Sequence, residues 1–251
     1  MNRQQFEAIM RQNIVGAAQA LNYSGASFAD FENSRSNPQY WNMTDQGGFR
    51  IRKEVTPAEG IRDIFRNGRM YAFECATAMV IVLYKAVLDS IGEQQFNRLF
   101  ANILLYDWHY DEDLRLIQVQ GSHRAAPGDI LYFINPDVSP ETPEWKGENT
   151  IKLNDTMYYG HGMGILPAEE IIASLNRHRR PGSNRSAYLT ENIVFPDFAY
   201  LSQFAPVANR IPPEWHAALQ AMEAGHGIFP SPHDTTAPAV TARVGRRRYI
   251  Q

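Results

Sequence analysis

The sequence predicts an α+β domain in which helices come first and a mostly antiparallel sheet follows. Apolar residues recur at helical spacing in most of residues 3–101, and from residue 102 onward they alternate with the period of two that is typical of strands. Residues 75–91 read CATAMVIVLYKAVLDSI and are apolar almost all round. Because a helix of this composition must be covered on every side, we expect it at the centre of the domain.

Three further helices are expected before residue 102. The first comprises residues 3–22, and its core-facing side chains are expected to be Phe6, Ile9, Met10, Val15, Ala18 and Leu21. The second, residues 57–67, starts with Pro57 at the first helical position, and Thr56 before it forms a capping box with Glu59. The third comprises residues 93–101 and follows Gly92, which ends the buried helix.

The second half of the chain is expected to form the sheet. Strands are predicted at residues 102–109, 116–120 and 129–134. Residues 149–153 and 156–161 predict a hairpin around a two-residue loop, Asn154-Asp155. Residues 167–179 return to a helical pattern, and residues 23–50, rich in Ser, Asn and Gly, are expected to be loops with room for one short strand.

The chain is expected to contain one folded domain, residues 1–204, followed by a tail, residues 205–251. The tail carries the Pro-containing stretch FPSPHDTTAP and ends in GRRRYIQ. This composition lacks the periodic apolar residues of a packed element, so residues 225–251 are expected to be mobile.

Composition excludes several classes of function. The net charge of −3 does not suit a general nucleic-acid binder, and no apolar run reaches the ~18–20 residues of a membrane helix. The N-terminal segment has no apolar stretch typical of a secretory signal. With 1 cysteine, the chain can form neither an internal disulfide nor a cysteine-cluster metal site, which is consistent with synthesis in a reducing compartment.

That single cysteine, Cys75, opens the predicted buried helix. The backbone N–H groups and the dipole at a helix start favour negative charge, so we expect the pKa of the thiol to be lowered and the reactive thiolate to be favoured. The same N–H groups could hold an oxyanion. The alternative is that Cys75 is an ordinary small residue of the core.

The predicted hairpin supplies partners for this thiol. With a two-residue loop, Glu148 lies directly opposite His161 on the same sheet face, with Cβ atoms about 4.5–5.5 Å apart. A carboxylate beside an imidazole orients it and raises its basicity, as in thiol enzymes. A slip of one residue would separate the pair. The alternative is an ordinary cross-strand pair of charges.

A metal site is conceivable on the strand predicted at residues 102–109, because alternation places Asp107, His109 and Asp111 on one face, with Asp113 nearby. We favour a solvated strand end there and predict no metal and no cofactor. The arginines at 246–248 are interpreted as part of a solvated tail.

Five blocks of the sequence resemble the transglutaminases of spore-forming bacilli. They are YAFECATAMVIV, ILLYDWHY, GDILYF, WKGEN and YGHGMGIL, which occur in order within residues 8–190. The resemblance implies calcium-independent protein-glutamine γ-glutamyltransferase activity and a papain-like core of the NlpC/P60 type. It assigns catalytic roles to Cys75, Glu148 and His161, with Glu74 at a second acidic position. The tryptophans lining the family's substrate tunnel correspond to Trp108 and Trp145.

The resemblance also implies partners and a setting. The substrates are expected to be proteins with accessible glutamine and lysine side chains, among them spore coat proteins, and neither nucleic acid nor membrane is expected to be a partner. We expect a monomer that is made in the cytoplasm and reaches the spore coat if the host sporulates. The N-terminus is shorter than in the family, and the tail shows no recognisable counterpart. Two alternatives are a papain-like cysteine peptidase or amidase and a non-catalytic coat protein.

Lysine is scarce in this sequence. Of 24 basic residues, 20 are arginine, and the lysines are Lys53, Lys85, Lys146 and Lys152. A GC-rich genome would explain this ratio. An enzyme that uses lysine as a substrate would also gain from it, because arginine is a poor nucleophile and escapes self-modification.

Overall fold

The computed structural model describes residues 2–206, 241–244 and 247–250. The chain divides into two compact units, Met1–Pro206 and Val207–Gln251. The second unit contains an antiparallel pair, β12 (Thr241–Val244) and β13 (Arg247–Ile250). The tail expected to be mobile otherwise lies outside the described residues. Within the described residues, no helix is both long and apolar enough to cross a membrane.

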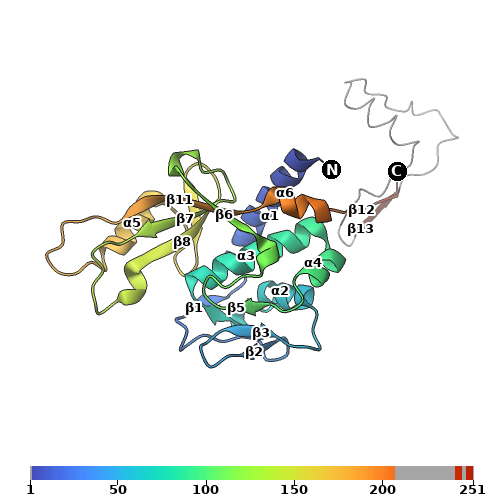
Figure 1. Ribbon diagram of the computed structural model, residues 1–251, viewed down its shortest axis with the longest axis horizontal. Coiled ribbons are helices and arrows are strands. Elements are labelled where there is room, and N and C mark those ends of the chain that lie inside the picture. Colours follow the sequence, from blue (N-terminus) through green and yellow to red (C-terminus); the bar gives the residue numbers. More distant parts are fainter. Residues whose placement is uncertain (1, 207–240, 245–246, 251) are drawn as a thin grey trace, which may run out of the picture. The chain divides into compact units, whose positions relative to one another are not determined.

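The predicted helices of the first unit are confirmed (Figure 1). They are α1 (Arg3–Tyr23), α2 (Pro57–Arg66), α3 (Cys75–Ile91) and α4 (Glu93–Leu99). The capping box of α2 is present, with Thr56 and Glu59 each bonded to the other's backbone N–H. On α1 the predicted core face is partly wrong. Ile9 is 39% exposed, and Ile14, which continues the helical stripe from Met10, is buried instead.

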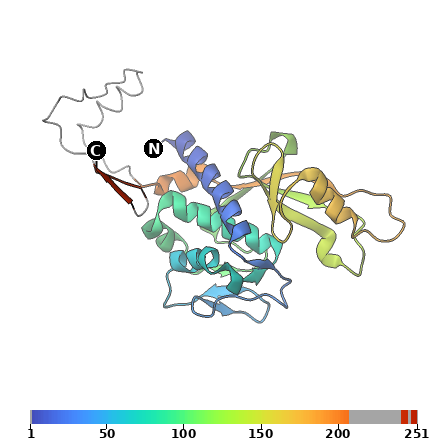
Figure 2. The same ribbon diagram turned by 180° about the vertical axis from the view of Figure 1, so that it is seen from behind.

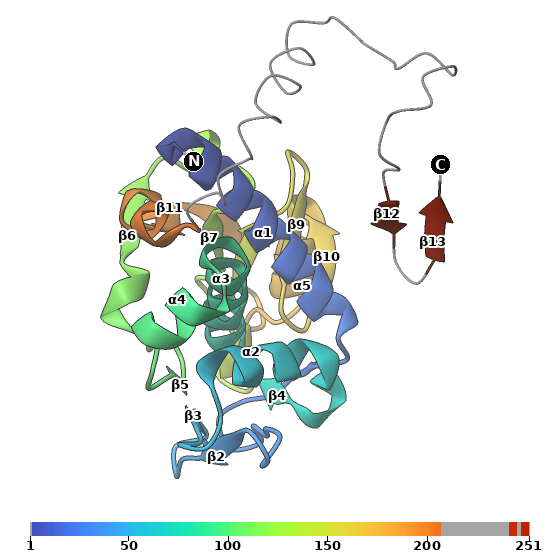
Figure 3. The ribbon, with the colours of Figure 1, turned by 90° about the vertical axis from the view of Figure 1, so that its right-hand side faces the viewer.

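Helix α3 lies at the centre of the helical part, with α1, α2 and α4 packed around it (Figures 2 and 3). All but three of its residues are buried, which is why its sequence carries no polar face. It also packs against the large sheet through β8, whose Asn149 contacts Cys75. Cys75, the first residue of this helix, therefore lies at the boundary between the helices and the sheet.

The large sheet has the strand order β10-β9-β8-β7-β11-β6, and every adjacent pair is antiparallel. Its strands are β6 (Leu116–Gln120), β7 (Ile130–Ile134), β8 (Gly147–Lys152), β9 (Met157–Gly160), β10 (Gly164–Pro167) and β11 (Tyr188–Pro196). Helix α5 (Ala168–Asn176) packs on β7, β10 and β11 around a second, smaller core. The sequence did not predict β10 or β11.

Three short strands form a second sheet: β2 (Trp41–Met43), β3 (Phe49–Ile51) and β5 (Leu104–Leu105). The strand predicted at residues 102–109 is thus wrong beyond residue 105. The chain turns instead, with Asp107 at a positive φ of 49° and a bridge between Tyr106 and His109. This turn removes the alternation that would have placed Asp107, His109 and Asp111 on one face.

Short elements complete the unit. They are β1 (Ser27–Phe28), which pairs in parallel with β4 (Ala72–Phe73), the helix α6 (Phe198–Leu201) and the 3-10 turns η1 (Gly68–Met70), η2 (Glu112–Leu114), η3 (Ser122–Arg124), η4 (Pro143–Lys146) and η5 (Ser202–Phe204).

The hairpin β8–β9 forms, but its predicted register is wrong by one residue. Thr150 pairs with Gly160, and the loop contains three residues, because the Asn154 side chain accepts from the N–H groups of Thr156 and Met157, both at 2.9 Å. This side-chain capping draws Thr156 into the turn. Glu148 is therefore not directly opposite His161.

Candidate active site

Cys75 is the first residue of α3, and Glu74 caps the helix. The Glu74 carboxylate accepts hydrogen bonds from the backbone N–H groups of Ala76, at 2.6 Å, and Thr77, at 2.5 Å. These are the unpaired donors that a helix start offers to an anion. The prediction that they could hold an oxyanion is wrong for these two groups, since Glu74 already occupies both.

The Cys75 thiol is half-buried and receives its hydrogen bond from Asn149, with 3.4 Å between Nδ2 and Sγ. Burial first, and then the nearby carboxylates of Glu148 and Glu74, raise the pKa of the thiol, the backbone and side-chain donors of Asn149 lower it, and the net pKa is about 12. The prediction of a lowered thiol pKa is therefore wrong: the carboxylates and the loss of water outweigh the helix start.

Glu148 lies on β8, immediately before Asn149, and is 5% exposed. Burial raises the pKa of its carboxyl well above the ordinary value, the charge of Glu74 raises it further, and the backbone N–H of His161 acts in the opposite direction. Within the described residues, Glu148 Oε1 has no hydrogen-bond partner. It lies against Gly160, where an added Cβ would approach Oε1 to 2.8 Å, so a side chain at that position would displace it.

His161 is buried, 3% exposed, and held from three sides. Its ring stacks on Phe73 with centroids 4.6 Å apart, Nε2 lies 3.1 Å from the carbonyl oxygen of Ser27, and Nδ1 lies 2.9 Å from the hydroxyl of Tyr159. A carbonyl can only accept, so Nε2 donates and Nδ1 accepts from Tyr159. Burial lowers the pKa of His161 to about 4. Both ring nitrogens are thus engaged by groups other than Cys75 and the Glu148 carboxylate.

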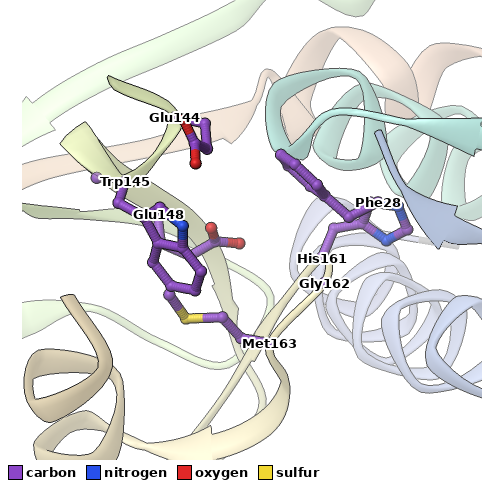
Figure 4. Close-up of a pocket in the computed structure, with 8 residues that line it drawn as sticks. Phe28, Glu144, Trp145, Glu148, His161, Gly162 and Met163 are labelled. Carbon is purple, nitrogen blue, oxygen red and sulfur yellow. The ribbon is translucent and has the colours of Figure 1, made fainter. Parts of the chain in front are cut away.

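Two cavities are lined by the neighbours of Cys75 on β8, one by Glu148 and the other by Asn149, which donates to the thiol. The first, which we call the acidic cavity, has a volume of about 280 Å³ and is lined by Phe28, Glu144, Trp145, Gly147, Glu148, His161, Gly162 and Met163 (Figure 4). The second, the amide cavity, has about 330 Å³ and is lined by Trp108, Tyr110, Leu116, Ile117, Gln118, Tyr132, Asn149, Asn192 and Val194. Successive residues of a strand point to opposite faces. Glu148 and Asn149 therefore face different cavities, and both act on the Cys75 thiol.

The two tryptophans singled out from the sequence are brought to this site, one to each cavity. Trp108 lies on the turn after β5, and Trp145 lies in η4. The Trp145 ring stacks on His178 with centroids 3.8 Å apart and an interplanar angle of 5°. Sequence analysis missed Phe28, Tyr132 and Asn149, although Asn149 lies within the block WKGEN and next to Glu148.

Among the residues that the structure describes, no three His, Cys, Asp or Glu side chains are grouped so that they could hold a metal ion. The acidic residues Asp111 and Asp113 form hydrogen bonds with other protein groups. Asp111 caps the 3-10 turn η2 by accepting from the N–H of Asp113, and Asp113 accepts a hydrogen bond from the Tyr200 hydroxyl.

A half-buried thiol at a helix start, with a buried carboxylate nearby and a side-chain amide donating to it, is typical of enzymes that transfer acyl groups through cysteine. The sequence pattern of the family described as protein-glutamine gamma-glutamyltransferase matches residues 1–205, and the chain belongs to this family. The protein joins glutamine to lysine side chains through isopeptide bonds.

Similar proteins agree with this assignment. A protein-glutamine gamma-glutamyltransferase of Bacillus cereus strain B4264 is 50% identical over 200 residues, covering 80% of this chain and 72% of the relative. The structure of a transglutaminase from Geobacillus stearothermophilus, without its C-terminal extension, is 53% identical with a TM-score of 0.79, covering 82% of this chain and 100% of that one. A Bacillus cereus strain 03BB102 relative is 44% identical over 240 residues, 96% of this chain and 81% of its own length, so similarity extends into the tail, contrary to our expectation.

Proposed function

We propose that cross-linking proceeds through a thioester on Cys75. The observation that supports this is the position of the thiol, which is half-buried and hydrogen-bonded to Asn149, a lining residue of the amide cavity. The sulfur attacks the side-chain carbonyl of a protein glutamine, the C–N bond breaks, and the thiol proton leaves with the nitrogen as ammonia. A lysine amine then forms the new C–N bond, the C–S bond breaks, and an amine proton returns to sulfur.

Glu148 is the proton carrier in both steps. Its ionised form takes the proton from the thiol and gives it to the departing nitrogen, and in the second step it takes a proton from the attacking amine. A raised carboxyl pKa suits this role, because transfer is most efficient when donor and acceptor have similar basicity. Glu74 fixes the helix start and raises the basicity of Glu148 by its charge. His161, neutral and engaged at both nitrogens, positions the wall of the acidic cavity.

Water has to be kept from the thioester, since its attack would release glutamate instead of the cross-link. Trp108 and Trp145 suit this role because each forms part of the wall of one of the two cavities. We further propose that the core is papain-like, of the NlpC/P60 type, on the basis of a cysteine-bearing helix that packs on an antiparallel sheet. Calcium independence and cross-linking of spore coat proteins, with residence in the coat, follow from the resemblance to the family.

The test is incubation of casein with a fluorescent primary amine. The wild-type protein should label casein, and both Cys75→Ala and Cys75→Ser should fail to do so while they keep the wild-type circular dichroism spectrum. Appreciable labelling by Cys75→Ser would exclude the thioester. Excess chelator should leave the wild-type rate unchanged, and a loss restored by calcium would contradict calcium independence. Glutamate release at the same rate with and without amine would identify an amidase instead.

A further inference from the structure

We propose that the acidic cavity admits the lysine ammonium and the amide cavity the glutamine, and that Glu144 selects charged amines at the entrance of the acidic cavity. This inference rests on the proposed cysteine thioester, because it assigns the two sides from which substrates reach Cys75. It adds a specificity-determining residue to the site.

The two cavities differ in charge. Glu144 and Glu148 line the acidic cavity, and no lysine or arginine is among its described lining residues. His161, its remaining titratable group, is neutral at ordinary pH because burial lowers its pKa to about 4. The lining of the amide cavity carries no acidic or basic side chain among the described residues. A cation is thus stabilised in the acidic cavity and has no counter-charge in the amide cavity.

Glu148 supplies an independent reason to expect a donor in the acidic cavity. Its side chain is nine-tenths buried, and its Oε1 has no hydrogen-bond partner within the described residues. An unpaired buried carboxylate oxygen is costly, and an amine or ammonium carries the N–H donors that would satisfy it. Figure 4 shows the Glu144 and Glu148 carboxylates on one side of the cavity, with Phe28 and His161 facing them.

The remaining walls of the acidic cavity suit the rest of a lysine side chain. Phe28, Trp145 and Met163 offer apolar surface to its four methylene groups. An ammonium group can also lie over the faces of the aromatic rings, where cations are attracted to the π electrons. The acidic cavity therefore combines apolar walls with carboxylates, and this combination suits a long side chain that ends in a positive charge.

The amide cavity suits a glutamine side chain. It offers the amide groups of Gln118, Asn149 and Asn192, which can both donate to and accept from a primary amide. Gln118 Nε2 already donates to Asn192 Oδ1 at 3.1 Å across strands β6 and β11. The rings of Trp108 and Tyr132 also line this cavity.

Glu144 lies at the entrance rather than at the reacting atoms. It is exposed, lies in the turn η4, and lines both the acidic cavity and an adjoining groove that also contains Asp30 and Arg35. An approaching lysine would meet Glu144 before Glu148. Because Glu144 is exposed, its attraction is moderate and sensitive to salt.

The experiment compares Glu144→Gln with the wild-type enzyme, using cadaverine as a charged amine and hydroxylamine as an amine that is uncharged at neutral pH. The KM for cadaverine should rise about threefold to fivefold at low salt, the size expected for one exposed charge, and this difference should shrink at high salt. The KM for hydroxylamine, the KM for the glutamine donor and kcat should stay unchanged. The matched control is Glu141→Gln, which removes an exposed carboxylate that lines neither cavity.

A second variant tests the assignment of the amide cavity to the glutamine substrate. Asn192→Ala should raise the KM for the glutamine donor and leave the KM for cadaverine unchanged. Equal effects of Glu144→Gln on both amines, or a rise in the KM for the glutamine donor, would overturn the assignment. All of these KM measurements use variants that retain Cys75. Activity remaining in Cys75→Ala would instead refute the thioester, so failure of the cavity assignment can be distinguished from failure of the thioester mechanism.

Discussion

The side-chain amide of Asn149 donates to the thiol of Cys75, with 3.4 Å between Nδ2 and Sγ. This donor and the backbone N–H of Asn149 are the groups that lower the thiol pKa, against burial and two carboxylates that raise it. A hydrogen bond to a charged group contributes about 1.5–3 kcal/mol, so Asn149 has a large share in making the thiolate accessible.

Asn149→Ala should therefore lower kcat about 10- to 100-fold and move the alkaline midpoint of iodoacetamide alkylation to higher pH. Asn149→Asp should move it further, since a third carboxylate then faces the thiol. Asn192→Ala alters the same cavity without touching Cys75 and should leave the midpoint in place. An unchanged midpoint in Asn149→Asp would show that Asn149 has no influence on the thiol.

The buried carboxylate of Glu148 is expected to lower the free energy of unfolding, although cross-linking requires it. Its pKa is raised in the folded state, so the stabilisation from its protonated form is complete below the pKa of the unfolded chain and is lost as pH rises through the folded value. Glu148→Gln should abolish cross-linking and yet increase the free energy of unfolding at pH 8 by on the order of 1 kcal/mol.

The measurement is urea unfolding of wild type and Glu148→Gln at pH 4 and pH 8, with Glu144→Gln as the exposed control. The two proteins should converge in stability at the lower pH, where the wild-type carboxyl is protonated. A variant that is less stable than wild type at pH 8 would contradict an uncompensated charge at Glu148.

His161 should make the protein sensitive to acid. Its folded pKa of about 4 lies below the ordinary value of 6.5, so the unfolded state binds more protons between these values, and stability falls as pH falls through this window. The loss from this group is about 3 kcal/mol by pH 4. His161→Asn should flatten the dependence of unfolding free energy on pH between 4 and 6.5, whereas His123→Asn, at an exposed position, should leave it unchanged. A variant that keeps the full wild-type slope would assign the acid sensitivity to other groups.

Local rules were sufficient where one segment determines the structure. The capping box at Thr56 and the all-round apolar run after Cys75 predicted α2 and α3 because both depend on neighbours in sequence. Strand β11 was missed because its register shifts between Leu189 and Ile193, which breaks the alternation, and because its middle residues are polar.

The site needed information from distant segments. A helix start predicted a lowered thiol pKa, but the outcome depends on the capping carboxylate of Glu74 and on Glu148, which the sheet brings from 73 residues further along the chain. The protonation of His161 likewise depends on the carbonyl of Ser27, placed there by the pairing of β1 with β4. Charge balance at a buried site is a property of the assembled fold.

The four lysines differ in their availability as acyl acceptors. Lys152 Nζ donates to the carbonyl of Ala125 at 2.8 Å and is part-buried, and Lys85 forms an ion pair with Asp89 on the same helix. Lys53 and Lys146 are exposed. Lys146 also adjoins Trp145, in the turn that borders the acidic cavity.

Self-modification should therefore be slight and concentrated on Lys146 and Lys53. A bound amine must be uncharged and free of other partners to attack the thioester, and a tied lysine first has to break its own contact. Intact-mass analysis and peptide mapping after prolonged incubation without other substrates should show few cross-links, located at these two positions, and Lys53→Arg combined with Lys146→Arg should remove most of them. The guanidinium that replaces each amine stays protonated and keeps the charge, so solubility is preserved. Abundant covalent oligomers joined through Lys85 and Lys152 would contradict the protective interpretation and leave genome composition as the explanation for the scarcity of lysine.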